Sequence, residues 1–180
     1  SKILPDIKDL MNSNVSIGDI RNLNIDDLLD REINKDYNFV KDLTKNKKVL
    51  ISGAGGSIGS ELCRQIILQN PSEIILLDHS EYNLYRIKDD LEKLCKIYKN
   101  LLLIKITPEL ISINNHAGLR HVFNRHMPNI IFHAAAYKHV NLVETNIFES
   151  IRNNFFGTLN IVKLASEFEI ENFVLISSDK

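Results

Sequence analysis

The sequence predicts a doubly wound α/β domain, in which helices cover both faces of a parallel sheet. Two observations support this prediction: five short apolar runs alternate with amphipathic helical patterns, and a glycine-rich segment joins the first run to the first pattern. Parallel strands require crossover connections, which are usually helices, so this alternation favours a parallel sheet. We expect the sheet to be truncated after its fifth strand and to follow a short helical N-terminal extension.

The extension is expected over residues 1–46, which are polar with short apolar repeats at helical spacing. Asp26 and Asp27 precede an apolar pair, where a carboxylate can cap a helix. The texture changes abruptly after a basic cluster that begins at Lys45. We therefore place a domain boundary at about residue 46 and assign residues 47–180 to the sheet domain.

Each element of the sheet domain has a local signal. The strands are short apolar runs, as expected for strands that are buried on both faces, at Val49–Ile51, Ile74–Leu77, Leu101–Ile106, Ile130–Ala136 and Phe173–Ile176. The helices carry apolar residues three or four positions apart, at 58–67, 84–98, 119–123 and 151–165. An irregular loop is expected before the third helix.

The composition and charge of the chain argue against several classes of partner and site. The 180 residues are 44 % hydrophobic and 25 % charged, which suits one globular domain. A formal net charge of −1 provides no positive field for a polyanion, so we expect no nucleic-acid partner. No apolar run approaches the roughly 20 residues that cross a bilayer, so we expect a soluble fragment without membrane contact. Cys63 and Cys95 match neither a metal nor a disulfide spacing, so we expect no metal site.

The glycine-rich segment predicts a phosphate-binding loop. Gly53, Gly56 and Gly59 follow the first strand and open directly into a helix. Glycines at this spacing allow a tight turn, a close approach to a pyrophosphate and a helix start packed on the sheet. We assign these glycines to cofactor binding, with Ser57 and Ile58 at the helix start, where backbone N–H groups face an anion. By itself, such a loop is also compatible with an ordinary turn.

Asp78 ends the second strand, close to the offset of about 20 residues at which an acid binds the adenosine ribose. A carboxylate there accepts hydrogen bonds from two hydroxyls and repels a 2′-phosphate, so NAD is favoured over NADP. A helix-capping aspartate is the alternative, and Arg86 or Lys88 could reach a phosphate. No lysine of the P-loop type follows the glycines, which argues against a P-loop nucleotidase.

The fourth strand ends in small and polar residues. Ala134 and Ala135 would let a flat cofactor ring lie against the backbone at the point where ligands of open α/β sheets bind, although alanines also serve ordinary packing. Lys138 and His139 follow at the same edge and could meet a phosphate or a sugar hydroxyl. We interpret His133, alone in an apolar strand, as a hydrogen-bonded core residue without a chemical role.

These segments, together with Asn153–Thr158 and Ser177–Lys180, resemble the extended short-chain dehydrogenase/reductase family. Within it they are similar to the membrane-associated polysaccharide-biosynthesis branch, the UDP-N-acetylglucosamine 4,6-dehydratases. The resemblance covers most of residues 15–180. It implies a Rossmann-type fold, NAD as cofactor and a nucleotide-sugar substrate that becomes a 4-keto-6-deoxy sugar. The alternatives are a nucleotide-sugar 4-epimerase and a dinucleotide-binding module without turnover.

The resemblance also implies roles for the last three residues. Hydride leaves sugar C4, the C5 proton is removed, water leaves from C6, and the hydride returns to C6. Asp179 would be the acid, Lys180 the base, and Ser178 would hold the sugar. A lysine can act as a base only if burial or a neighbouring charge lowers its pKa. Without the resemblance, Asp179 and Lys180 would be interpreted as an exposed ion pair.

Other positions carry over from the family residue by residue. Lys138 matches a position close to the nucleotide-sugar, and Asn154 matches one that steadies the active-site backbone. Ser80 and Asn83 match residues around the adenosine. Ser112 stands where the family has an aspartate pair near the adenine, so we expect an altered adenine contact there.

The resemblance also describes a longer parent protein. Residues 1–46 resemble the segment that follows a membrane-embedded region, so the parent is expected at the cytoplasmic face of the bacterial inner membrane. The family's Tyr-x-x-x-Lys or Met-x-x-x-Lys pair and sugar-binding lobe would follow Lys180. We expect the 180-residue fragment alone to be inactive. Apolar surface meant for the absent parts favours self-association into a homo-oligomer.

Overall fold

The computed structural model describes residues 2–3, 21–22, 37–98 and 101–177. The chain divides into two compact units, residues 1–36 and residues 37–180.

In the first unit, β1 (Lys2–Ile3) pairs antiparallel with β2 (Arg21–Asn22). Short helices were expected within residues 1–46, and the four residues described in the first unit form paired strands. Short isolated helices are marginal in water, and β1 and β2 satisfy backbone groups by pairing instead. The rest of the predicted extension up to residue 36 lies outside the described residues.

The second unit begins with α2 (Tyr37–Thr44), so the division falls earlier than the expected boundary near residue 46. The reason is packing, because Leu43 lies against the core and Thr44 is fully buried. The Thr44 hydroxyl donates to the Val40 carbonyl at 2.8 Å. The expected boundary would separate α2 from the unit on which it packs.

Five parallel strands form the sheet of the second unit, in the order β5-β4-β3-β6-β7. Their bounds are β3 (Lys48–Ser52), β4 (Glu73–Asp78), β5 (Lys105–Leu110), β6 (Ile130–His133) and β7 (Asn172–Leu175). The order reverses at β3, which pairs with β4 on one side and with β6 on the other. This arrangement confirms the predicted Rossmann-type fold, and it places a ligand-binding switch point at the carboxyl ends of β3 and β6.

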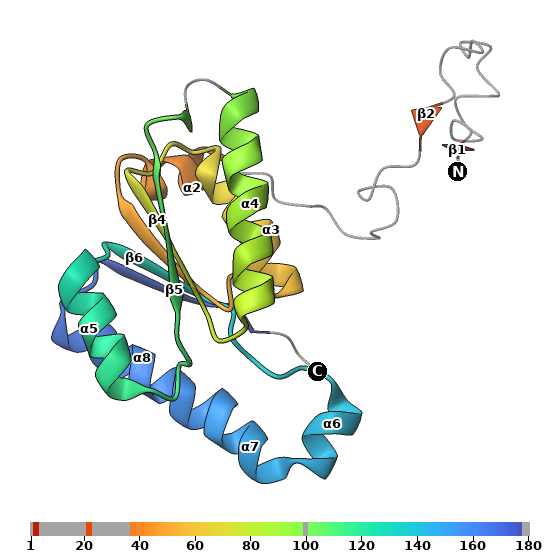
Figure 1. Ribbon diagram of the computed structural model, residues 1–180, viewed down its shortest axis with the longest axis vertical. Coiled ribbons are helices and arrows are strands. Elements are labelled where there is room, and N and C mark those ends of the chain that lie inside the picture. The colour runs from red at the N-terminus through yellow and green to blue at the C-terminus, as the bar shows by residue number, and fades with distance from the viewer. Residues whose placement is uncertain (1, 4–20, 23–36, 99–100, 178–180) are drawn as a thin grey trace. The chain divides into compact units, whose positions relative to one another are not determined.

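Helices cover both faces of this sheet (Figure 1). The helices are α3 (Ser57–Ile67), α4 (Glu81–Ile97), α5 (His116–His126), α6 (Val140–Thr145), α7 (Ile147–Ile151), the π-helix η4 (Arg152–Gly157) and α8 (Thr158–Glu167). Val49 and Ile51 of β3 pack under α3 and α4, whereas Leu50 packs under α5 and α8. Successive residues of a strand point to opposite faces, so the apolar run fills both cores.

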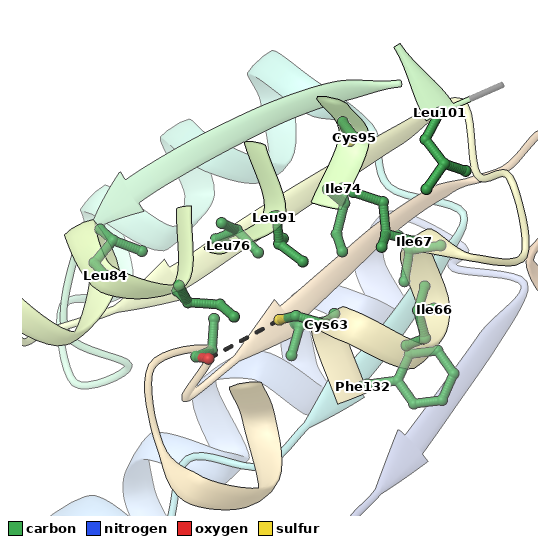
Figure 2. Packing of buried hydrophobic residues seen from close by; sticks show 14 of the residues in the cluster. Cys63, Ile66, Ile67, Ile74, Leu76, Leu84, Leu91, Cys95, Leu101 and Phe132 are labelled. Atoms are coloured by element: carbon green, nitrogen blue, oxygen red, sulfur yellow. Dashed lines mark hydrogen bonds between the residues drawn. The ribbon is translucent and has the colours of Figure 1, made fainter. Parts of the chain in front are cut away.

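Cys63 lies in the core under α3 and α4 (Figure 2), where its Sγ is 3.9 Å from the carbonyl oxygen of Ala54. Cys95 is buried in the same cluster. Burial raises the pKa of both thiols, which favours the unreactive protonated form. Both cysteines therefore serve as small apolar core residues.

The third predicted strand is displaced along the chain. Leu101–Ile106 was expected to be extended, but β5 begins at Lys105 and runs to Leu110. Leu101 is buried while Leu103 is 94 % exposed, so this leucine-rich run is a turn that anchors one side chain. The prediction was wrong because β5 is an edge strand, in which every residue is at least partly exposed and polar residues interrupt the apolar run.

The last predicted helix begins earlier than expected and is interrupted. Helical structure starts at Ile147 and changes to the π-helix η4 before continuing as α8. The short helix α6 was not predicted. Among the described residues, no helix is both long and apolar enough to cross a bilayer.

Candidate functional site

The glycine-rich loop is fixed by two close backbone approaches. Gly53 has φ of 68°, and a Cβ there would lie 2.8 Å from the backbone of Ala134 and Ala135. At Gly59 a Cβ would lie 1.9 Å from the carbonyl oxygen of Gly53. The loop therefore turns tightly beside the end of β6, and the first turn of α3 rests on it. This is the geometry for which glycine was predicted at both positions.

The start of α3 forms a positively polarised corner. Gly56 is the N-cap and has no side chain with which to satisfy the first N–H groups of the helix. The Lys138 ammonium donates to the Ser57 hydroxyl at 2.9 Å, beside the same helix start. A cation next to the positive end of a helix dipole is unfavourable unless an anion lies with them. The corner is therefore suited to a phosphate group.

Asp78 connects the end of β4 to the glycine loop. Its side chain is 6 % exposed; Oδ2 accepts from the Gly55 N–H and Oδ1 from the Ser80 N–H, both at 2.9 Å. Asp78 therefore holds the backbone of the glycine loop and lines a cavity, whereas the N-cap of α4 is Ser80 rather than Asp78. Ribose binding by Asp78 stays a prediction. A carboxylate oxygen can accept a second hydrogen bond, for example from a ribose hydroxyl.

The start of α4 closes the side of this loop. Ser80 caps the helix by accepting from the Asn83 N–H at 3.4 Å, and a Cβ on Gly55 would lie 2.4 Å from Asn83 Cβ. The altered adenine contact that is expected at Ser112 stays a prediction, and the Ser112 side chain is turned toward the backbone that follows it. Its hydroxyl accepts from the Asn114 N–H at 3.2 Å, and the residues on either side of Ser112, rather than Ser112 itself, line the cavity.

Three hollows adjoin along the carboxyl edge of the sheet, and Ala134, Ala136 and Tyr137 line all of them. The first hollow lies against the glycine loop and Asp78. The second has a volume of about 470 Å³ and lies beside the start of α3. Its lining also includes Ser57, Ile58, Lys138 and His139. The third continues past His139 to Leu175, Ile176 and Ser177.

Asn154 holds the backbone that these hollows share. Its Oδ1 accepts from the Tyr137 N–H at 2.8 Å, and its Nδ2 donates to the Tyr137 carbonyl at 3.0 Å. Asn154 lies in η4, where the π-helical turn places its side chain toward this loop. Such turns often occur at functional sites. These two hydrogen bonds hold the Tyr137 backbone, which is the kind of role that the family resemblance implies for Asn154.

His133 is a hydrogen-bonded core residue, as the sequence suggested. It is 2 % exposed, and its ring lies between the hydroxyls of Ser52 and Thr158. Burial lowers its pKa to about 4, so the ring is neutral at physiological pH.

The structure thus brings together most of the residues that were predicted for cofactor binding. Those gathered on the loop, on the helix starts and around the hollows are Gly53, Gly56, Ser57, Ile58, Gly59, Asp78, Ser80, Asn83, Ala134, Ala135 and Lys138, and His139, which was predicted for substrate binding, lines the second and third hollows. Ser178, Asp179 and Lys180 lie outside the described residues. Across the part of the chain that the structure describes, no cluster of three or more metal-ligating side chains is present.

Sequence reasoning missed several lining residues. Ile111 and Ile113 close the first hollow from the chain that follows β5, and Asn153 lies beside them. The two isoleucines could have been found from their alternate spacing around Ser112, which puts both on one side of an extended segment. Asn153 carried no separate signal, because its neighbour Asn154 has the recognisable family position.

Comparisons with known proteins agree with this fold and site. A family profile described as "Polysaccharide biosynthesis protein" matches residues 49–180. The chain is 39 % identical to the capsular polysaccharide biosynthesis protein CapD of Staphylococcus aureus, over 98 % of this chain and 29 % of that protein. It is 30 % identical to a dTDP-glucose 4,6-dehydratase of Neisseria gonorrhoeae, over 68 % of this chain and 33 % of that enzyme.

A solved structure has the same fold. The UDP-glucose 4-epimerase of Bifidobacterium longum, in complex with NAD+ and UDP, matches with a TM-score of 0.61 and 19 % identity, over 73 % of this chain and 37 % of the epimerase. The chain spans about a third or less of the length of the two curated relatives. The family profile covers the sheet from the second residue of β3 onward. The chain belongs to the polysaccharide biosynthesis protein family, and its relatives include a nucleotide-sugar dehydratase and a nucleotide-sugar epimerase.

Proposed function

We propose that this chain is the cofactor-binding part of an NAD-dependent nucleotide-sugar 4,6-dehydratase that acts on UDP-N-acetylglucosamine in glycan biosynthesis. The observation that carries the proposal is the continuous lining of the carboxyl edge. A glycine loop, a buried carboxylate and a lysine at a helix start surround adjoining hollows. Gly53–Gly59 suits the pyrophosphate of a dinucleotide and Asp78 suits its adenosine ribose, while Lys138 suits a phosphate of the nucleotide sugar or of the cofactor.

The residues present fit NAD. Asp78 retains acceptor capacity toward the first hollow, so it can bind ribose hydroxyls, and its negative charge opposes a 2′-phosphate. A relative of the same fold has been solved with NAD+ and UDP bound. NAD, when bound, supplies the acceptor for the hydride of sugar C4. The chain's part is to hold the dinucleotide at Gly53, Gly56 and Gly59 and to keep Tyr137 in place through Asn154.

The catalytic roles rest on the family resemblance. Asp179 would donate a proton to the departing C6 hydroxyl, Lys180 would remove the C5 proton, and Ser178 would hold the sugar. Support comes from the preceding residue, because Ser177 lines the same hollow as Lys138 and His139. Lys138 and His139 are proposed to bind the substrate's phosphate or sugar hydroxyls.

The proposal extends to the longer protein. Residues 1–46 would link a membrane-embedded region to the catalytic domain at the cytoplasmic face, and a sugar-binding lobe would complete the site. The segment of CapD that matches this chain at 39 % identity makes up 29 % of that protein. This proportion supports a longer parent protein. The 180-residue fragment would bind NAD without turning over substrate.

The test is product analysis with the full-length protein, NAD and UDP-N-acetylglucosamine, followed by mass spectrometry and NMR. We expect a product that has lost one water and carries a C4 ketone. A product of unchanged mass with inverted C4 would instead establish a 4-epimerase. Absence of any product, while the protein still binds NAD, would indicate a binding module. Lys180→Met is the matched control, because it should abolish dehydration while NAD binding is retained.

A further inference from the structure

The buried His133 side chain is the centre of a chain of hydrogen bonds that the proposed mechanism does not use. Its Nδ1 lies 2.5 Å from the Ser52 Oγ at the end of β3, and its Nε2 lies 2.8 Å from the Thr158 Oγ1 at the start of α8. The Phe173 ring lies against it, with centroids 6.1 Å apart. A polar ring in this apolar setting is costly to bury unless its bonds are all made.

The direction of these bonds follows from a third contact. The Thr158 hydroxyl donates its one proton to the main-chain carbonyl oxygen of Asn154 at 2.7 Å. A carbonyl oxygen can only accept a hydrogen bond. The Thr158 oxygen must therefore accept from His133, which places a proton on Nε2. A neutral ring has only that proton, so Nδ1 is an acceptor and the Ser52 hydroxyl donates to it. The protons therefore point one way, from Ser52 to Asn154.

The far end of this chain reaches the candidate site. Asn154 lies in the π-helix η4, and its side chain makes both hydrogen bonds to the Tyr137 backbone. Tyr137 lines the three adjoining hollows. His133 itself lines only the third hollow and is almost fully buried, so any effect it has on the first two acts through Asn154.

We propose that His133 is a positioning residue for the cofactor site: held as the Nε2–H tautomer, it fixes η4 so that Asn154 keeps the Tyr137 backbone in place. The inference rests on the proposed function, because the hollows that Tyr137 lines are taken as the NAD site. Protonation of the ring would make Nδ1 a donor and leave the Ser52 hydroxyl without this acceptor. The lowered pKa of His133 agrees with a ring that stays neutral.

Thr158→Val tests the proposal, because it keeps the side-chain shape and removes the hydroxyl that links His133 to Asn154. We expect amide hydrogen exchange at Tyr137 to become about tenfold faster and NAD to bind about tenfold more weakly by calorimetry, since one lost hydrogen bond is worth roughly that factor. Thr158→Ser restores the hydroxyl and should restore both values. Ile161→Val, in the same helix and fully buried, should lower stability without changing either value.

Nitrogen chemical shifts of the His133 ring give an independent readout, and we expect the Nε2–H tautomer. An Nδ1–H tautomer, or unchanged Tyr137 exchange in Thr158→Val, overturns the proposal. If Thr158→Val does not fold, Ser52→Ala removes the hydrogen bond at the other end of the chain. The Nε2–H tautomer should persist, because Thr158 still accepts from Nε2, but the ring is then held on one side only and Tyr137 exchange should become faster. Unchanged Tyr137 exchange refutes the coupling. A folded wild-type protein that fails to bind NAD overturns the proposed function, whereas the tautomer and exchange results still decide the coupling.

Discussion

The close approach of α3 to the glycine loop predicts opposite outcomes for two glycine-to-alanine substitutions. In Gly59→Ala the new Cβ would meet the Gly53 carbonyl oxygen at 1.9 Å and its carbonyl carbon at 2.7 Å. In Gly56→Ala the new Cβ would lie 3.2 Å from that oxygen and meet nothing closer. Both changes add one methyl group to the same loop, so each serves as the control for the other.

The expected cost of Gly59→Ala follows from these distances. The carbonyl would have to move by about 1.1 Å to restore a 3.0 Å contact, and it is backbone that is already fixed against β6. Overpacking of this kind costs up to about 3 kcal/mol, and the better helix propensity of alanine returns about 1 kcal/mol. We expect the free energy of unfolding to fall by about 2 kcal/mol, and Tm by roughly 6 °C.

Gly56→Ala should leave the fold largely intact, because a few tenths of an ångström of movement relieves its contact and an N-cap alanine costs less than about 1 kcal/mol relative to glycine. Its methyl group would instead project where Gly56 lines the first two hollows. Calorimetry should show NAD binding weakened by at least about tenfold, because the backbone can no longer approach the pyrophosphate.

Thermal unfolding by circular dichroism, with NAD titration of each folded variant, separates the two effects. A Gly59→Ala protein as stable as the wild type would refute the described contact between α3 and the loop. A Gly56→Ala protein that binds NAD normally would refute the assignment of the loop to the pyrophosphate.

Three further predictions concern charged and titratable groups. Asp78→Asn removes the charge that opposes a 2′-phosphate, so the ratio of NAD to NADP affinity measured by calorimetry should fall, and an unchanged ratio would remove Asp78 from cofactor selection. The buried His126 ring lies within hydrogen-bond distance of Glu73 at 3.1 Å and of Glu109 at 2.7 Å. His126→Leu removes both contacts and should lower the free energy of unfolding by about 2 kcal/mol in urea denaturation, and His126→Gln by clearly less. Burial lowers the pKa of His133 to about 4, while the unfolded side chain titrates near 6.5, so the unfolded state binds more protons between these two pH values. The free energy of unfolding should therefore fall by up to about 3 kcal/mol as the pH drops from 6.5 to 4. His133→Gln should flatten this dependence on pH.

The central strands were predictable because their signal comes from burial alone. Val49–Ile51 and Ile74–Leu77 are buried on both faces, and the structure extends each run by one residue at each end. The edge strand was not predictable in the same way, because one of its faces carries polar side chains while an apolar turn precedes it. The signal that identified buried strands therefore selected Leu101–Ile104 in error.

The candidate site divides along a similar line. Gly53 and Gly59 were predictable because only glycine meets the backbone requirement at those positions. Asn154 could be assigned a role only through the family resemblance, because its partners at Tyr137 are 17 positions away and depend on a π-helix. Nothing in a local pattern indicates such a turn, which arises when one additional residue is accommodated in a helix.

The central claim is that the glycine loop and Asp78 form an NAD site, and calorimetric titration of the wild-type 180-residue chain with NAD and NADP tests it most directly. The account predicts saturable binding of NAD at one site per chain, with NADP bound at least about tenfold more weakly because the buried Asp78 carboxylate opposes a 2′-phosphate. A folded chain that binds neither dinucleotide, or that binds NADP as tightly as NAD, would contradict it.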